Sequence, residues 1–204
     1  MKEQKIEHAI FDYGGVIGFS SKNEVVTRIA QNCDVDPNKI SQIILKNTIN
    51  MQKVSMPEED FWRGITKGLK VNNLDNLAYT WIETIKGTSK IDLDVLTFLE
   101  DLSKFYKLSL LSNSTQLYFY SPFRSVLNRL FSEEIYSCDI GFRKPEKEIY
   151  DSTLTRLNAG PSQCVIIDDE PENLVYPSSI GMATVLYKGL PDLKSKLCRQ
   201  PVLK

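Results

Sequence analysis

Histidine is almost missing from this chain, because His8 is the one imidazole among its 204 residues. Ser-His-Asp and Cys-His nucleophile systems, facial iron triads and most catalytic zinc sites need one or more imidazoles. His8 lies four residues before Asp12 in one expected strand, a position that favours a structural or exposed role. Any chemistry in this chain is therefore expected to depend on carboxylates, lysine and hydroxyls.

Long apolar runs and an excess of one charge are also missing. No stretch approaches the roughly 18 continuous apolar residues of a membrane span. The formal net charge of -1 gives no basic field for nucleic acid or an anionic membrane. The cysteines form no Cys-x-x-Cys pair, which argues against a zinc site or a redox pair. We expect a cytoplasmic protein that binds neither nucleic acid nor a membrane.

Strand-like and helix-like segments alternate after residue 90, which is the pattern of a parallel sheet covered by helices. An apolar strand also ends at Phe11, and the other expected strands are residues 107–111, 135–138, 164–167 and 182–186. Residues 19–87 differ, because they contain helical segments and no convincing strand. We interpret them as a helical insertion after the first strand, with Phe61, Trp62 and Trp81 in its core.

Polar groups follow four of the five expected strands, at the strand end or in the loop after it. These groups are Asp12, Ser112-Asn113, Lys144 in a loop, and Asp168-Asp169. Because the carboxyl ends of parallel strands lie along one edge of an open sheet, and ligands bind there, these groups are expected to meet in one pocket.

Three carboxylates in one pocket need a cation, since two unit charges about 4 Å apart repel by about 4 kcal/mol at an effective dielectric of 20. Mg2+ is the expected cation, because it takes hard oxygen ligands and also binds phosphate oxygens. Lys144 and the Ser112 hydroxyl then fit as donors to the rest of a phosphoryl group.

In this order, the four polar groups resemble the motifs of the haloacid dehalogenase (HAD) superfamily. The matching features are Asp12 in Phe-Asp-x-Gly-Gly-Val-Ile, Ser112-Asn113 after an apolar strand, Lys144 before Pro145, and Asp168-Asp169 with Asn173. The resemblance covers essentially the whole chain. It implies an α/β fold with a doubly wound, Rossmann-like parallel sheet in residues 1–18 and 88–204, and a helical cap of the C1 type in residues 19–87.

The same resemblance implies a role for each residue. Asp12 is expected to be the nucleophile that takes the phosphoryl group as an aspartyl phosphate, which water then releases. Ser112 and Asn113 are expected to bind the substrate, and Lys144 to neutralise the transferred group and keep Asp12 ionised. Asn173 is expected to orient Asp169 or to serve only its own helix. The expected Mg2+ ligands are Asp12, the Gly14 carbonyl, Asp168 and Asp169.

Gly14 departs from the family pattern, because phosphatases of this family usually have an aspartate two residues after the nucleophile. That aspartate acts as general acid and base, which is typically worth about 10²–10⁴-fold in rate. We expect a Mg2+-dependent hydrolase of small phosphorylated metabolites with good leaving groups, such as sugar phosphates like glucose 1-phosphate. The alternatives are a weak or inactive HAD-fold binding protein and a 2-haloacid dehalogenase, whose halide leaves without a proton.

Overall fold

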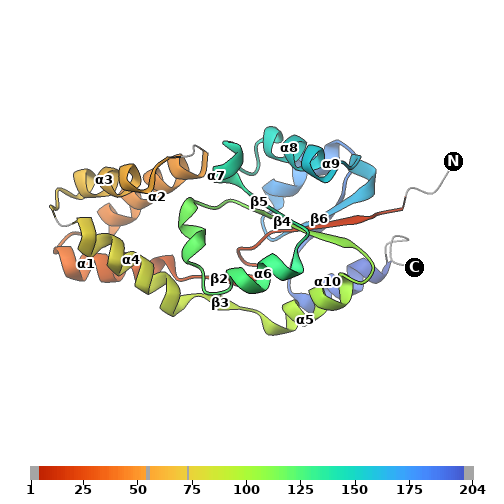
Figure 1. The fold of residues 1–204 in the computed structure, drawn as a ribbon, viewed down its shortest axis with the longest axis horizontal. Helices are drawn as coiled ribbons and strands as arrows, with labels where there is room; N and C mark the ends of the chain where they lie inside the picture. Colours follow the sequence, from red (N-terminus) through yellow and green to blue (C-terminus); the bar gives the residue numbers. More distant parts are fainter. Residues whose placement is uncertain (1–4, 54–55, 73, 200–204) are drawn as a thin grey trace.

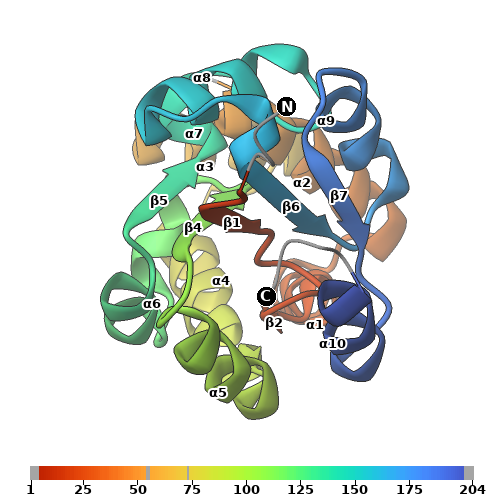
Figure 2. The ribbon, with the colours of Figure 1, turned by 90° about the vertical axis from the view of Figure 1, so that its right-hand side faces the viewer.

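The computed structural model describes residues 5–53, 56–72 and 74–199, and within them a parallel sheet forms the centre of the molecule (Figures 1 and 2). Its strands are β1 (His8–Phe11), β4 (Lys107–Ser112), β5 (Glu133–Tyr136), β6 (Cys164–Asp168) and β7 (Ala183–Leu186). They lie in the order β5-β4-β1-β6-β7, and every neighbouring pair is parallel. Numbered along the chain this is the order 3-2-1-4-5 of a doubly wound Rossmann-like sheet, so the predicted fold class is confirmed.

Side chains alternate between the two faces of the sheet and build a separate core on each. Ala9 and Phe11 of β1 pack on one face, whereas Ile10 between them packs on the other. Helices α5 (Leu93–Leu102), α6 (Arg124–Leu130) and α10 (Leu190–Arg199) cover the face of Phe11. Helices α8 (Lys147–Leu157) and α9 (Val175–Ser179) cover the face of Ile10, and Figure 2 shows these two groups on opposite sides of the strands. Both faces are therefore closed to water.

Several predicted strand boundaries differ from the observed ones by one or two residues. Ser137 and Cys138 begin a short helix, α7 (Ser137–Ile140), instead of ending β5, and Met182 precedes β7. The Ser137 hydroxyl accepts a hydrogen bond from the Ser114 backbone N–H at 3.1 Å and donates to the Ser114 carbonyl at 3.0 Å. The loop that follows β4 thus supplies the hydrogen-bond partners of Ser137, in place of a neighbouring strand.

The segment between β1 and α5 contains a second group of helices, which we call the helical insertion. It consists of α1 (Lys22–Cys33), α2 (Pro37–Lys53), α3 (Glu58–Leu69) and α4 (Leu74–Thr88), and Figure 1 shows it at the end of the molecule opposite α10. A short antiparallel ribbon of β2 (Gly18–Phe19) and β3 (Lys90–Ile91) connects it to the sheet. The interpretation of residues 19–87 as a cap stays a prediction.

The insertion has its own hydrophobic core, separate from the cores of the sheet. Phe61 and Trp62 are buried in it as expected, and Trp81 packs against them with its ring edge-on, 5.5 Å from the Trp62 ring. Leu117 belongs to the same core although it lies in a 3-10 helix, η1 (Gln116–Tyr120), that directly follows the β4 loop. Among the described residues, no helix combines the length and apolar character needed to cross a membrane.

Candidate active site

Asp12 follows β1 directly, at the carboxyl edge of the sheet. Its backbone N–H donates to the Ile167 carbonyl at 2.9 Å, so the neighbouring strand β6 still holds it in register. The chain then turns back, because the N–H groups of Ile17 and Gly18 both donate to the Tyr13 carbonyl at 3.0 Å. The carboxylate is thus fixed between a strand on one side and a tight loop on the other.

Lys144 joins two of the three carboxylates by ion pairs. Its Nζ lies 2.7 Å from Asp12 Oδ1 and 2.6 Å from Asp168 Oδ2, and only 2% of the residue is exposed. The two carboxylates together carry one negative charge more than the lysine neutralises. Because all three groups are buried, this excess charge is poorly screened by water.

Burial raises the pKa of Asp12 to about 6, in spite of the favourable charge of Lys144. The nearby Asp168 contributes to this increase in pKa, whereas the hydrogen bonds from Lys144 and from the Tyr13 backbone oppose it. Burial also raises the pKa of Asp169. Ionising Asp12 and Asp169 in this site therefore costs folding free energy, and a bound cation would lower that cost.

Asp168 is fully buried, and its oxygens are already used by protein donors. In addition to Lys144 at Oδ2, the Glu170 N–H and the Asn173 side chain each donate to Oδ1 at 2.9 Å. The expectation that Asn173 orients Asp169 is therefore wrong, because its amide binds Asp168. Asp168 holds Lys144 in place from behind, whereas Asp169 faces the pocket.

A metal ion fits among these carboxylates. One oxygen each of Asp12, Asp168 and Asp169 lie within 4.8 Å of one another. Asp169 lies against Gly15, where an added Cβ would lie 2.1 Å from its Oδ2, so the glycine makes room for this carboxylate. Hard oxygen atoms at this spacing suit Mg2+. Asp12 and Asp169 are the carboxylates open to the pocket; the predicted use of the Gly14 carbonyl stays a prediction.

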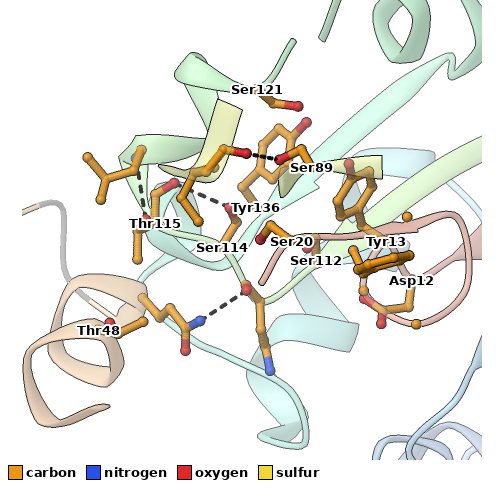
Figure 3. A pocket seen from close by; sticks show the side chains of 18 of the residues that line it. Asp12, Tyr13, Ser20, Thr48, Ser89, Ser112, Ser114, Thr115, Ser121 and Tyr136 are labelled. Atoms are coloured by element: carbon orange, nitrogen blue, oxygen red, sulfur yellow. Dashed lines mark hydrogen bonds between the residues drawn. The ribbon is translucent and has the colours of Figure 1, made fainter. Parts of the chain in front are cut away.

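Ser112 and Asn113 lie at the end of β4, as predicted, but their side chains differ in surroundings. Ser112 lines the pocket beside Asp12 (Figure 3). The Asn113 amide instead pairs with the backbone of Lys144: its Oδ1 accepts from the Lys144 N–H at 2.8 Å, and its Nδ2 donates to the Lys144 carbonyl at 3.0 Å. Asn113 thus holds the lysine loop, and its side chain has little capacity left for a substrate.

Gly14 leaves an open space beside Asp12. A Cβ at this position would lie 3.9 Å from Asp12 Oδ2, which is an ordinary contact and the nearest one among the described residues. A longer side chain at position 14 would therefore lie beside the carboxylate oxygen that Lys144 does not bind.

The site opens into a cavity of about 550 Å³ between the sheet edge and the helical insertion. Every predicted site residue except Asp168 lines it: Asp12, Gly14, Ser112, Asn113, Lys144 and Asp169. The insertion contributes Thr48 and Gln52 from α2 and Trp81, Ile82 and Ile85 from α4. Figure 3 shows Thr48 at the side of the pocket opposite Asp12. Sequence reasoning did not place these residues in the pocket, because their helical spacing does not tell which neighbour they face.

The parallel order of the strands and the lysine–carboxylate site define an α/β protein with a ligand site at its sheet edge. The chain belongs to the haloacid dehalogenase-like hydrolase family, whose model matches residues 6–175. The predicted family is therefore confirmed: this chain is a HAD family hydrolase.

Two characterised relatives differ in how much of the chain they match. D-ribitol-5-phosphate phosphatase of Bacteroides thetaiotaomicron is 23% identical over 203 residues, which is 94% of this chain and 97% of that enzyme. Mouse bifunctional epoxide hydrolase 2 is 40% identical over 60 residues, which is 29% of this chain. The match spans about a tenth of the mouse protein's length, 11%.

Solved structures of the family share the fold at low identity. The HAD family enzyme BT-2542 of Bacteroides thetaiotaomicron has a TM-score of 0.80 at 20% identity, covering 96% of this chain and 100% of that one. A further structure of that enzyme is a complex with magnesium and inorganic phosphate; its TM-score is 0.74 at 20% identity, over 90% and 94% of the two chains. A predicted HAD-like family hydrolase of Porphyromonas gingivalis has a TM-score of 0.76 at 20% identity, over 96% and 98%.

The excess buried charge predicts that Asp12→Asn stabilises the metal-free protein. The folded state raises the Asp12 pKa, so the carboxylate costs stability as pH rises from about 4 to above 6. In EDTA at pH 8 the variant's Tm should exceed that of the wild type by on the order of 5 °C, and the gain should vanish near pH 4. Asp34→Asn, the same change at an exposed helix end, should alter Tm little at either pH. A Tm at or below the wild-type value at pH 8 would contradict this account.

The two neighbouring glycines give a matched pair for the geometry of the loop. Gly15 has a φ of +73° and no room for a Cβ beside Asp169, whereas Gly14 has room for one. Gly15→Ala should lower the free energy of unfolding by about 1–3 kcal/mol, measured by urea denaturation. Gly14→Ala should change it by less than about 0.5 kcal/mol. Equal effects of the two substitutions would show that the close approach of Asp169 to Gly15 is not a constraint.

Proposed function

We propose that this chain is a Mg2+-dependent phosphatase that hydrolyses small polyol or sugar phosphates through a phosphorylated Asp12. The observation that carries the proposal is the Asp12–Lys144–Asp168 ion-pair chain, which places a buried, ionised carboxylate at the wall of a large pocket. A carboxylate in this position is a nucleophile that can form an acyl phosphate.

Asp12, Lys144 and Ser112 each take part in the proposed reaction. An Asp12 oxygen attacks phosphorus, the bond from phosphorus to the ester oxygen breaks, and the leaving oxygen takes a proton from water, because Gly14 supplies none. Lys144 and Ser112 donate hydrogen bonds where negative charge gathers on the transferred group. Water then attacks the phosphorus of phosphorylated Asp12 and gives up a proton to solvent, which releases inorganic phosphate and restores the carboxylate.

Asp12 and Asp169, with the Gly14 carbonyl, would hold the Mg2+. When bound, the ion supplies charge neutralisation for the phosphoryl oxygens. Support comes from the cluster of three carboxylates, which exceeds the single buried lysine in charge, and from the magnesium and phosphate complex of the structurally similar BT-2542.

The pocket walls favour a substrate with hydroxyls on one side. Thr48 Oγ1 on α2 is buried and has no hydrogen-bond partner among the described residues, so a ligand hydroxyl would satisfy it. Helix α4 supplies an apolar wall for the C–H groups of a substrate, formed by Trp81, Ile82 and Ile85. A polyol or sugar phosphate has both kinds of surface. The full-length similarity to D-ribitol-5-phosphate phosphatase supports the same class.

We also propose that the helical insertion acts as a cap that encloses this substrate. Its own core and its two-stranded connection support a unit that can move relative to the sheet. Closure would exclude bulk water from the phosphoryl group.

A phosphate-release screen tests the proposal. Ribitol 5-phosphate, glucose 1-phosphate, glucose 6-phosphate and p-nitrophenyl phosphate are assayed with Mg2+ and with EDTA, for wild type and Asp12→Asn. We expect release that depends on Mg2+ and falls to background in the variant, because the nucleophile is lost. Activity that survives Asp12→Asn contradicts the covalent mechanism. Absence of release from every ester favours the binding-protein alternative, and metal-independent halide release from a 2-haloacid favours the dehalogenase.

The open space at Gly14 predicts how the leaving group sets the rate. Gly14→Asp places a proton donor beside Asp12, so turnover of alkyl esters such as glucose 6-phosphate should rise by up to about 100-fold. Hydrolysis of p-nitrophenyl phosphate, whose leaving group needs little protonation, should change less. Gly14→Asn has the same size without an exchangeable acid and serves as the control. An equal rise with both variants would mean that packing, and not proton transfer, limits the rate.

A further inference from the structure

The end of helix α2 reaches from the insertion to the loop that carries Lys144. Gln52, in its last turn, is 8% exposed, and its Nε2 donates to the Asn113 carbonyl at 3.0 Å. A carbonyl can only accept, so the amide nitrogen of Gln52 is the atom that faces it. This hydrogen bond joins residues 61 positions apart and links the insertion to the end of β4.

Asn113 connects Gln52 to the lysine, because it forms hydrogen bonds with both residues. Its backbone carbonyl binds Gln52, and its side chain forms the two hydrogen bonds with the Lys144 backbone described above. Lys144 then ends in the ion pairs with Asp12 and Asp168. A continuous series of hydrogen bonds therefore runs from an insertion helix to the carboxylate that we propose as nucleophile.

A second contact of α2 approaches Lys144 from its other side. Lys53 forms an ion pair with Glu146, and the Glu146 Oε2 accepts a hydrogen bond from the Arg143 backbone N–H at 3.3 Å. Lys53 thus contacts the Glu146 end of this loop directly, whereas Gln52 reaches the loop only through Asn113. The ion pair is partly exposed, so the buried Gln52 contact is the stronger constraint on geometry.

We propose that Gln52 is a positioning residue that aligns Lys144 through Asn113, so that the lysine is correctly placed only when α2 is docked. The inference rests on the proposed phosphatase function. It gives the insertion a part in the chemical step in addition to enclosing the substrate. Gln52 lines the pocket as well, so its effect on the lysine has to be separated from direct contact with the body of a substrate.

The test variant is Gln52→Met, which keeps the length and helix propensity of the side chain and removes its donor. Gln42→Met makes the same change at an exposed position of α2. Thr48→Val removes the other pocket-lining polar group of the helix, four residues earlier. Circular dichroism and Tm establish that each variant is folded; if Gln52→Met does not fold, Gln52→Ala takes its place.

Kinetics are measured with ribitol 5-phosphate and with acetyl phosphate, which has no polyol body to reach α2. For Gln52→Met we expect kcat to fall roughly tenfold with both compounds, the equivalent of about 1.4 kcal/mol, while KM changes little. Thr48→Val should raise KM for ribitol 5-phosphate alone, and Gln42→Met should behave as wild type. A loss confined to ribitol 5-phosphate would overturn the proposal, because it would assign Gln52 to substrate binding.

The reactivity of the Lys144 amine gives a readout that does not depend on turnover. Reductive methylation is followed by peptide mass spectrometry, with the exposed Lys147 as internal reference. Lys144 should react several-fold faster in Gln52→Met than in wild type or Gln42→Met. An unchanged reaction rate overturns the proposal, as does an unchanged kcat in an active enzyme. If wild type releases no phosphate from any ester, the proposed function fails, and the lysine reactivity alone decides whether Gln52 positions Lys144.

Discussion

The buried pairing of one lysine with two carboxylates is the constraint on which the rest of the site depends. Lys144 is held by Asp168 from behind and by Asp12 in front, and each of the three comes from a different segment at the sheet edge. A buried lysine without partners would lose its proton, and two buried carboxylates without a cation would gain one. The parallel strands, the glycine loop and the Asn113 contacts all serve to keep these three charges within hydrogen-bonding distance.

The pocket above this pairing combines two different structures. The sheet edge supplies charged and hydroxyl groups whose positions follow from strand order, whereas the insertion supplies one polar and one apolar wall. In the proposed phosphatase, reaction type and substrate choice therefore depend on separate parts of the chain. Gln52 is the exception, because it belongs to the insertion and contacts Asn113, whose side chain binds the Lys144 backbone.

The fold and most of the site were predictable from the sequence, because strand ends in a parallel sheet share one edge. Apolar runs that stop at Asp12, Ser112 and Asp168 carry enough information to place these residues together. It was not predictable that the Asn173 amide binds Asp168 and not Asp169, since the choice between two adjacent aspartates depends on the turn after β6. Thr48 and Gln52 were missed for another reason: their role depends on how α2 docks, and helical periodicity describes a face without naming what it touches.

Leu117 gives the boundary between the two parts an unexpected position. Although it follows β4 and lies far from the insertion in sequence, its side chain completes the hydrophobic core that α1 to α4 enclose. The insertion is therefore not a self-contained module that could be exchanged between relatives by cutting at its two connecting strands. A chimera that transplanted residues 19–87 alone would leave a hole in the grafted core and an exposed leucine on the donor scaffold, so η1 has to travel with the helices that it serves.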